Sequence, residues 1–366
     1  MIRIFIGVIG LLASILIHAQ VKQSDMKWKG NDASVRYTGR TAVAADGSVS
    51  FDWVGTYLET KFSGGRVDIL LSEKGTSYYN VFVDGKLHRV VKACGQDTVI
   101  NFVSGVSKKS HSLRIQKRTE GEFGRTTIHG FCLASSGFLQ VELSTRTRHI
   151  EFIGNSLTCG YGTESKDKNE PFKLETENCN HSFSTIIPRY FDADYTLIAH
   201  SGRGAVRNYG DSVRVSAVTM KDKMMQTFDE DPASRWDFST YSPDLVVINL
   251  GTNDFSLEPQ PYKSEFVKSY TQILTQLREG YGNIPILCIY SCTISVPVYD
   301  FYKAAVEAMH DDKIYLFPLE KGLLNTSTDL GAVWHPGYQG HQKMAMQLIP
   351  FISTITGWNL TGKPIE

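Results

Sequence analysis

Short runs of alternating polar and apolar residues characterise the N-terminal part of the chain. Residues 48–53 show this alternation, which is typical of strands with one buried face. An Asp-Gly dipeptide at residues 84–85 separates two further strand-like runs, 79–83 and 86–91, and is a strong signal for a two-residue hairpin. The pattern therefore predicts a jelly-roll-like β-sandwich over residues 26–145.

The pattern changes after residue 145. Apolar strands then alternate with helical stretches, and the clearest helix spans residues 262–279, with its apolar side chains on one face. The predicted strands lie at residues 149–153, 194–199, 244–250, 284–290 and 313–317. Strands that are apolar throughout and separated by amphipathic helices indicate a parallel sheet that is covered on both faces. We therefore expect a three-layer α/β/α domain over residues 146–360.

The first residues have the features of a secretory signal peptide. Arg3 is followed by an apolar run from residue 4 to residue 17, and Ala19 precedes a polar residue. A membrane anchor is the alternative, but the run is shorter than the roughly 20 residues that a membrane-spanning helix needs. We predict that residues 1–19 are removed by cleavage near Ala19. The mature protein would then be secreted or periplasmic and would have no membrane segment.

The composition gives no sign of a nucleic-acid-binding protein. Lys and Arg number 38, Asp and Glu also number 38, and no basic cluster stands out along the chain. The cysteines and histidines lack the spacing of a metal site, and the glycines at 160 and 162 lack the lysine of a phosphate-binding loop. We expect neither a nucleic-acid partner nor a metal or other cofactor.

Six cysteines in an exported chain permit disulfide bonds. Cys159 and Cys179 flank one loop, and a disulfide between them would fix that loop. Two buried unpaired thiols are the alternative.

Candidate catalytic residues follow several of the predicted parallel strands. Sites in parallel α/β sheets form at the carboxyl ends of the strands, so the residues just past each strand are informative. The polar residues and glycines found there, or just before the last helix, include Ser156, Gly204, Asn253 and His335. A serine can attack an acyl carbon while a histidine takes its proton. The N–H groups of Ser156 and Gly204, with the Asn253 side chain, can hold the oxyanion.

These assignments have alternatives in the sequence. Ser156 could cap the helix that follows it, and Gly202 is a second possible oxyanion donor. His341 competes with His335 as the base. His335 is preferred because Pro336 places it in a turn at the sheet edge, whereas His341 enters the last helix.

Four sequence blocks resemble those of the SGNH/GDSL hydrolases. They are residues 153–162 (IGNSLTCGYG), 201–210 (SGRGAVRNYG), 249–255 (NLGTNDF) and 334–336 (WHP). Residues 36–40 and the hairpin at 81–85 are similar to the β-sandwich of carbohydrate esterase family 2, whose members are acetyl esterases acting on plant polysaccharides. The resemblance implies a β-sandwich followed by an SGNH hydrolase domain.

The resemblance also implies roles for individual residues. Ser156 corresponds to the nucleophile and His335 to the general base. The N–H groups of Ser156 and Gly204, together with Asn253, correspond to the oxyanion donors. Separately from the resemblance, the aromatic side chain of Trp334 could stack on a sugar ring, with Tyr161 and Trp236 as weaker candidates. Core packing is the alternative for each, and it is the favoured one for Trp236.

The chain lacks an acid at the usual third position of the triad. Many SGNH enzymes have an aspartate two or three residues before the histidine, where this chain has Ala332 and Val333. A backbone carbonyl can fix the histidine tautomer instead, which leaves a Ser–His dyad. We expect this dyad at His335, and the alternative is that the nearest acid, Asp329, reaches the imidazole.

The function that the resemblance implies is that of an exported serine esterase without a cofactor. It would remove O-acetyl groups from plant-type polysaccharides such as acetylated xylan or glucomannan. One alternative is an esterase acting on another acylated glycan. A second is a glycan-binding protein with a weakened hydrolase site, which the missing aspartate favours and the joint presence of Ser156, Asn253 and His335 opposes.

Overall fold

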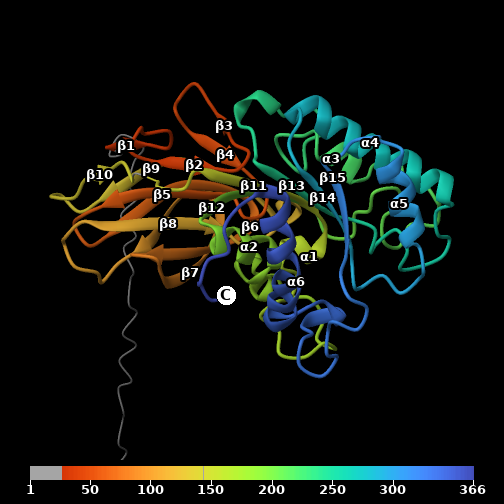
Figure 1. The fold of residues 1–366 in the computed structure, drawn as a ribbon. Coiled ribbons are helices and arrows are strands. Elements are labelled where there is room, and N and C mark those ends of the chain that lie inside the picture. The colour runs from red at the N-terminus through yellow and green to blue at the C-terminus, as the bar shows by residue number, and fades with distance from the viewer. Residues whose placement is uncertain (1–26, 143) are drawn as a thin grey trace, which may run out of the picture.

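The computed structural model describes residues 27–142 and 144–366, and the signal peptide predicted at residues 1–19 lies outside them. An antiparallel β-domain is followed by an α/β-domain built on a parallel sheet, and the two lie side by side (Figure 1). The predicted fold class is confirmed. The last strand of the β-domain ends at Gln140 and the first parallel strand begins at Arg148.

The described part of the β-domain contains one ten-stranded sheet, in the order β10-β5-β8-β6-β9-β4-β3, with β1 paired to β9, β2 to β5 and β7 to β6. The longest strands, β6 and β7, form the predicted hairpin. Asp84 and Gly85 both have positive φ there, as a two-residue type I′ turn requires. The strands are β1 (Trp28–Lys29), β2 (Arg36–Thr38), β3 (Ala42–Val43), β4 (Val49–Phe51), β5 (Tyr57–Phe62), β6 (Val67–Val83), β7 (Lys86–Val103), β8 (His111–Lys117), β9 (Gly124–Leu133) and β10 (Leu139–Gln140).

The α/β-domain contains a five-stranded parallel sheet in the order β12-β11-β13-β14-β15. Its strands are β11 (Arg148–Gly154), β12 (Ala193–Ala199), β13 (Leu245–Asn249), β14 (Ile286–Tyr290) and β15 (Ile314–Pro318). The helices are α1 (Ser156–Cys159), α2 (Phe183–Phe191), α3 (Met220–Lys223), α4 (Lys263–Tyr281), α5 (Tyr299–Glu307) and α6 (Tyr338–Thr356). Short 3₁₀ turns include η2 (Gly121–Phe123), η3 (Leu174–Thr176), η4 (Cys179–His181), η5 (Phe238–Thr240) and η6 (Ala332–Trp334).

Helices cover both faces of the parallel sheet (Figure 1). Helices α2 and α6 pack on the face that presents Ile150 and Phe152, and α4 and α5 pack on the face that presents Ile153 and Ile198. Successive strand residues point to opposite faces, so the strands are apolar throughout because both faces are buried. Among the described helices, none combines the length and apolar character that a membrane span needs.

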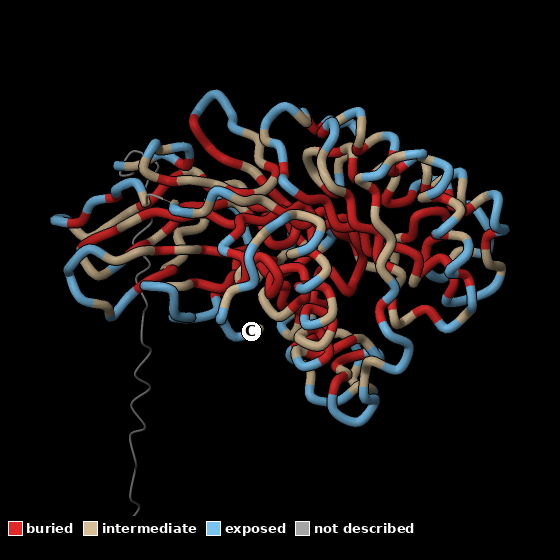
Figure 2. Tube along the Cα trace, in the orientation of Figure 1, coloured by how far each residue is buried: buried red, intermediate tan, exposed pale blue. Residues whose placement is uncertain are grey.

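The connection between β4 and β5 packs the β-domain onto the parallel sheet. Trp53 has no exposed surface and joins the core beside α4, whereas Val54 and Tyr57 join the core on the α2 and α6 side. Gly55 lies between them with φ of 76°, and a Cβ atom there would lie 2.7 Å from Leu197 Cδ1. Figure 2 shows the buried segments of both domains meeting in the centre of the molecule. The two domains therefore share part of their apolar core.

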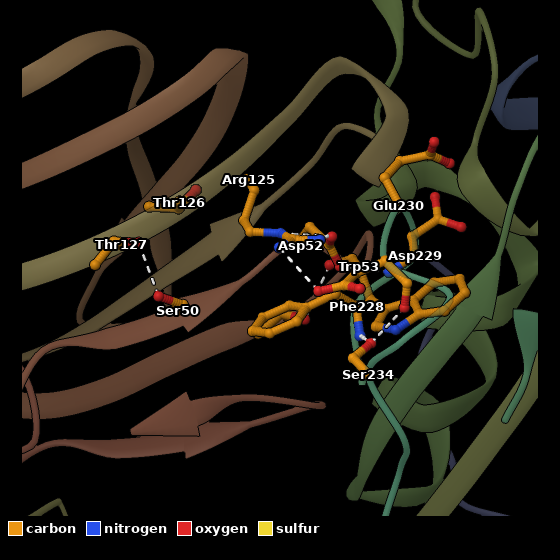
Figure 3. Close-up of polar contacts among 12 residues, drawn as sticks. Ser50, Asp52, Trp53, Arg125, Thr126, Thr127, Phe228, Asp229, Glu230 and Ser234 are labelled. Carbon is orange, nitrogen blue, oxygen red and sulfur yellow. Dashed lines mark hydrogen bonds and ion pairs between the residues drawn. The ribbon is translucent and has the colours of Figure 1, made fainter. Parts of the chain in front are cut away.

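Asp52 fixes the same connection through polar contacts. Its carboxylate accepts a hydrogen bond from the backbone N–H of Asp229 at 2.8 Å and pairs with Arg125 Nε at 3.1 Å (Figure 3). The Arg125 guanidinium lies 4.1 Å from the ring centre of Phe228. Burial, with the neighbouring charge of Asp229, raises the pKa of Asp52 to about 6. The interface thus combines apolar packing with a buried acid whose oxygens are hydrogen-bonded.

Replacement of Trp53 by alanine tests the shared core. The Trp53→Ala variant is expected to lose roughly 3–5 kcal/mol of unfolding free energy, because the cavity would open between the two domains. The exposed Leu87 provides the control, and Leu87→Ala should stay within about 0.5 kcal/mol of wild type. Urea unfolding monitored by far-UV circular dichroism measures both values. A loss at Trp53 no larger than that at Leu87 would contradict the shared core.

Candidate active site

Ser156 is the first residue of the four-residue helix α1, and only Asn155 separates it from β11. Asn155 caps this helix, since its Oδ1 accepts the Leu157 N–H at 3.2 Å, so the capping role considered for Ser156 falls to its neighbour. A side chain at Gly154 is excluded, because a Cβ atom would lie 2.0 Å from Thr158 Oγ1. The strand end therefore presents the Ser156 hydroxyl without a capping bond of its own.

The imidazole of His335 contacts this hydroxyl. Its Nε2 lies 2.9 Å from Ser156 Oγ, and its Nδ1 lies 3.0 Å from the carbonyl oxygen of Val333. A carbonyl oxygen can only accept, so Nδ1 must carry the proton of the neutral ring. Nε2 is then unprotonated and accepts the hydrogen bond of the Ser156 hydroxyl. This is the arrangement that a general base needs.

A left-handed turn directs the Val333 carbonyl towards His335. Val333 and Trp334 have φ of 52° and 60°, a region that β-branched and bulky residues rarely adopt. The backbone N–H groups of these two residues donate to the carbonyl oxygens of Glu170 and Lys168 at 3.1 and 3.0 Å. The loop that follows the candidate nucleophile therefore holds the turn that carries the base.

Asp329, the alternative third member of the triad, makes its contacts elsewhere. Its carboxylate accepts from the Asn325 N–H at 2.7 Å and the Thr328 hydroxyl at 2.9 Å, and it pairs with Lys343 Nζ at 2.5 Å. The position beside His335 Nδ1 is taken by the Val333 carbonyl. Asp329 thus stabilises the segment before the turn and does not orient the imidazole.

His341, the alternative base, is a core residue. Its side chain is buried in α6 against the ring of Phe183, with ring centres 6.0 Å apart. Neither ring nitrogen has a hydrogen-bond partner among the described residues, and burial lowers the pKa of His341 to about 3. A neutral imidazole enclosed in this way has no route to Ser156.

Two of the predicted oxyanion donors lie in the loops that follow the strands flanking β11. Gly204 follows β12 and Asn253 follows β13, so both lie at the sheet edge where Ser156 begins α1. The Asn253 amide donates one hydrogen to the Arg203 carbonyl at 2.8 Å, which leaves its second hydrogen available. The Gly204 N–H has only a long contact, 3.4 Å, with Asn208 Oδ1. Both groups can therefore supply a donor at this edge.

Asp254 holds the segment that follows Gly204. Its buried carboxylate accepts the three backbone N–H groups of residues 205–207 at 2.7 to 3.0 Å. A Cβ atom at Gly204 would lie 2.5 Å from Asp254 Oδ2, so only glycine fits there. Gly202, the alternative donor, lies earlier in the same loop with φ of 74°. Asp254 therefore shapes this loop, a role that suits its position beside Asn253.

A stack of aromatic rings extends from His335 into the β-domain. The Tyr161 ring centre lies 4.3 Å from that of His335 and 4.1 Å from that of Phe172, and Phe172 in turn lies 5.5 Å from Phe123 in η2.

Burial lowers the pKa of His335, and the carbonyls of residues 332 and 333 oppose this shift only in part. The rings thus favour a neutral base. Sequence reasoning missed Phe123 because it follows no parallel strand.

Two of the aromatic residues predicted to contact sugar differ in accessibility. Trp334 is 56% exposed, and the Lys168 ammonium lies 4.4 Å from its ring centre. Tyr161 is only half-buried, but its ring already contacts His335 and Phe172. Trp334 therefore offers the larger free aromatic surface beside the candidate base.

One group of potential metal ligands occurs in the described part of the chain. The ligand atoms of His200, Asp229 and Glu230 lie within 4.8 Å of one another. The Lys223 ammonium binds both carboxylates, at 2.9 Å from Asp229 and 2.7 Å from Glu230. This lysine supplies the positive charge that a metal would otherwise bring, so the group is best described as an ion-pair cluster.

Cys159 and Cys179 are buried free thiols, and no disulfide joins them. Burial raises the pKa of Cys179 to about 12 and raises that of Cys159 strongly. Of the two possibilities open from the sequence, the structure therefore has the unpaired thiols. The loop between them is held by hydrogen bonds instead, including one from the Thr185 hydroxyl to the Cys179 carbonyl at 2.7 Å.

Two family models match the chain in succession. The model described as Carbohydrate esterase 2 N-terminal matches residues 37–141. The model described as GDSL-like Lipase/Acylhydrolase family matches residues 152–343, just over half of the chain.

Curated relatives match over both domains. Cellulase/esterase CelE of Acetivibrio thermocellus is 32% identical over 339 residues, which are 90% of this chain but 40% of that protein. The chain thus spans less than half of this longer relative. An acetylxylan esterase / glucomannan deacetylase of Cellvibrio japonicus is 26% identical over 96% of this chain and 98% of that protein.

Solved structures with both domains are also similar. A family two carbohydrate esterase from Clostridium thermocellum in complex with cellohexaose has a TM-score of 0.82 and 30% identity, over 89% of this chain and 100% of that chain. A family two carbohydrate esterase from Cellvibrio japonicus has a TM-score of 0.80 at 22% identity, over 90% of this chain and 97% of that chain, and shows the shared fold.

The stacked environment of His335 gives a testable titration. We expect its imidazole to gain a proton only below the ordinary value of about 6.5, because burial disfavours the cation. His200 provides the internal comparison: burial lowers its pKa, but the hydrogen bond and charge of Asp229 and the charge of Glu120 together outweigh burial and raise it. NMR titration of labelled histidines, assigned with His335→Gln and His200→Gln, measures both. A higher pKa at His335 than at His200 would contradict this account.

Proposed function

The chain belongs to carbohydrate esterase family 2, and we propose that it is an exported esterase that removes O-acetyl groups from plant-type polysaccharides such as acetylated xylan or glucomannan. The observation that carries the proposal is the chain of contacts from Ser156 Oγ to His335 Nε2 and from His335 Nδ1 to the Val333 carbonyl. The names of relatives, acetylxylan esterase / glucomannan deacetylase, support this class of substrate.

Acylation would begin at Ser156. His335 Nε2 takes the hydroxyl proton as Ser156 Oγ bonds to the acetyl carbonyl carbon, and the carbonyl oxygen becomes an oxyanion. The N–H groups of Ser156 and Gly204 and the Asn253 amide stabilise this charge. The bond from carbon to the sugar oxygen then breaks, and His335 returns the proton to that oxygen. The products are the free sugar hydroxyl and an acetyl-enzyme.

Deacylation would reverse these roles with water. His335 takes a proton from a water molecule, whose oxygen attacks the acetyl carbon bound to Ser156. The same donors hold the second oxyanion. When the bond to Ser156 Oγ breaks, His335 protonates that oxygen, and acetate leaves. Each cycle restores the neutral imidazole, and no step requires a metal.

The absence of a triad acid does not prevent these steps. The role of the acid in a triad is to fix the histidine tautomer and to stabilise the imidazolium. The Val333 carbonyl fixes the tautomer through a hydrogen bond of ordinary length, and its dipole points its negative end at the ring. In the Ser–His dyad that we propose, the imidazole is therefore still oriented, but its protonated form is stabilised less than it would be by a carboxylate.

Trp334 is proposed to bind a sugar ring of the polysaccharide. It is exposed next to His335, and the left-handed turn fixes its backbone. Stacking of a sugar ring on its face would place an acetylated hydroxyl near Ser156. An ester of another glycan would use the same chemistry, so the choice of polysaccharide rests on the family relationship. A glycan-binding protein with a weakened site is less well supported, because the serine and imidazole are in hydrogen-bond contact.

Acetate release from acetylated xylan and glucomannan tests the nucleophile and the base. Ser156→Ala and His335→Ala should each lower kcat by about 10³-fold or more, because each removes a reacting group. Asp329→Ala should keep most of the activity and lose thermal stability, because its carboxylate holds the segment before the turn. Equal acetate release by wild type and Ser156→Ala would rule out Ser156 as the nucleophile. If a folded Asp329→Ala variant lost nearly all activity, the result would support a Ser–His–Asp triad with Asp329 as the acid.

Trp334→Ala tests the sugar contact. The variant is expected to raise KM for acetylated xylan by about tenfold, which corresponds to roughly 1.4 kcal/mol of lost contact. Its activity on 4-nitrophenyl acetate should be unchanged, because that ester has no sugar ring to stack. Tyr262→Ala, at an equally exposed aromatic residue, is the control. If Trp334→Ala lost activity equally on acetylated xylan and on 4-nitrophenyl acetate, Trp334 would stabilise the turn and would not bind the glycan.

A further inference from the structure

The connection between β8 and β9 reaches from the β-domain into the site. Residues 117–121 are fully buried. The Arg118 Nε donates to the Glu177 carbonyl at 2.7 Å, and Lys117 Nζ donates to the carbonyl oxygens of Thr119 and Glu120 at 2.7 and 2.9 Å. These bonds hold the connection in one conformation against the α/β-domain.

Glu120 presents both carboxylate oxygens to the loop that carries Gly204. The Ser201 backbone N–H donates to Glu120 Oε2 at 2.5 Å, and the Ser201 hydroxyl donates to Oε1. Ser201 is the second residue after β12 and begins the loop that leads to Gly204. A bidentate contact of this kind restrains both the backbone and the side chain of the loop at its start.

The same residue is linked to the loop that follows Ser156. The Glu120 N–H donates to Glu177 Oε2 at 3.2 Å. Burial, followed by the charge of Glu120, raises the pKa of Glu177 well above its ordinary value, which favours the protonated form beside Glu120. Glu177 lies directly after η3, in the loop that also supports the left-handed turn of His335. Glu120 thus touches both segments that surround the candidate nucleophile.

We propose that Glu120 of the β-domain is a positioning residue of the esterase, and that its carboxylate holds the Ser201–Gly204 loop in the geometry that the oxyanion hole requires. The inference rests on the proposed function. It extends the site across the domain boundary, since the β-domain supplies the group that fixes an oxyanion donor.

The expected kinetic effect follows from the fact that the loop carries a donor that stabilises the transition state. An oxyanion donor acts only when the carbonyl oxygen has become charged, so a displaced donor raises the barrier without weakening substrate binding. Loss of Glu120 should therefore lower kcat and leave KM nearly constant. The negative charge of Glu120 also opposes the burial that lowers the pKa of His335. Two other titratable groups lie near His335, and both stay neutral in the assay range: burial raises the pKa of Tyr161 to about 12 and lowers that of His341 to about 3.

Two substitutions separate geometry from charge. Glu120→Gln can keep both contacts, because its amide oxygen accepts the Ser201 N–H and its NH₂ group can donate to the Ser201 hydroxyl, but it has no charge. Glu120→Ala keeps neither. Glu59→Gln is the matched control: Glu59 is a buried acid of the β-domain that pairs with Arg36 and Arg146, and these arginines bind Asp194 at the other end of β12.

Kinetics with 4-nitrophenyl acetate over a range of pH provide the test. Glu120→Ala should lower kcat at least about tenfold with KM within about threefold of wild type. Glu120→Gln should keep most of kcat, but the acid limb of its kcat/KM profile should move to lower pH, because the charge that raised the pKa of His335 is gone. Glu59→Gln should change neither quantity.

Several outcomes would overturn the proposal. They are wild-type kcat in Glu120→Ala, a loss of kcat in Glu59→Gln equal to that in Glu120→Ala, or a loss of kcat in Glu120→Gln equal to that in Glu120→Ala. If Glu120→Ala does not fold, Ser201→Ala removes one of the two contacts and should lower kcat without moving the acid limb; an unchanged kcat there would also overturn the proposal. Ser156→Ala distinguishes the two levels: if it is inactive while Glu120→Ala is fully active, only the role of Glu120 fails.

Discussion

The hydrogen bond from His335 Nδ1–H to the Val333 carbonyl keeps the opposite ring nitrogen free to accept a proton. It exists because Val333 and Trp334 adopt left-handed backbone conformations, which cost on the order of 1–3 kcal/mol each. Backbone hydrogen bonds to residues 168 and 170, with the bridge between Leu330 and Pro336, hold the turn in this state. The state of the base therefore depends on the loop that follows Ser156.

Replacement of an acid by a carbonyl changes the electrostatics of the site. A carboxylate would stabilise the imidazolium with a full charge, whereas the carbonyl offers only a dipole. The pKa of His335 is accordingly lowered by burial, and its carbonyl partners restore only part of the difference. The Asp329 carboxylate instead pairs with Lys343 and accepts a hydrogen bond from the segment before the turn. The environment of His335 thus favours the neutral imidazole over the imidazolium.

The sequence predicted the parallel sheet and the residues at its edge, because strand periodicity and strand ends are local features. Ser156, Gly204 and Asn253 were predicted from these strand ends, and His335 from its place ahead of the last helix and from the family resemblance. The Val333 carbonyl could not be found, since every residue has one and only the backbone conformation directs it. Glu120 and Phe123 were missed for another reason. They reach the site through the packing of one domain on the other, which no local pattern along the chain encodes.

The proposed site uses residues from both sides of the domain boundary, and this has a consequence for how the protein can evolve by recombination. Recombination between the coding segments for β10 and β11 would separate Glu120 and Phe123 from Ser156 and His335. A transfer between genes that keeps all four residues must therefore carry parts of both domains as one unit. The CelE relative agrees with this unit, because the 40% of its length that matches corresponds to 90% of this chain and so includes both domains.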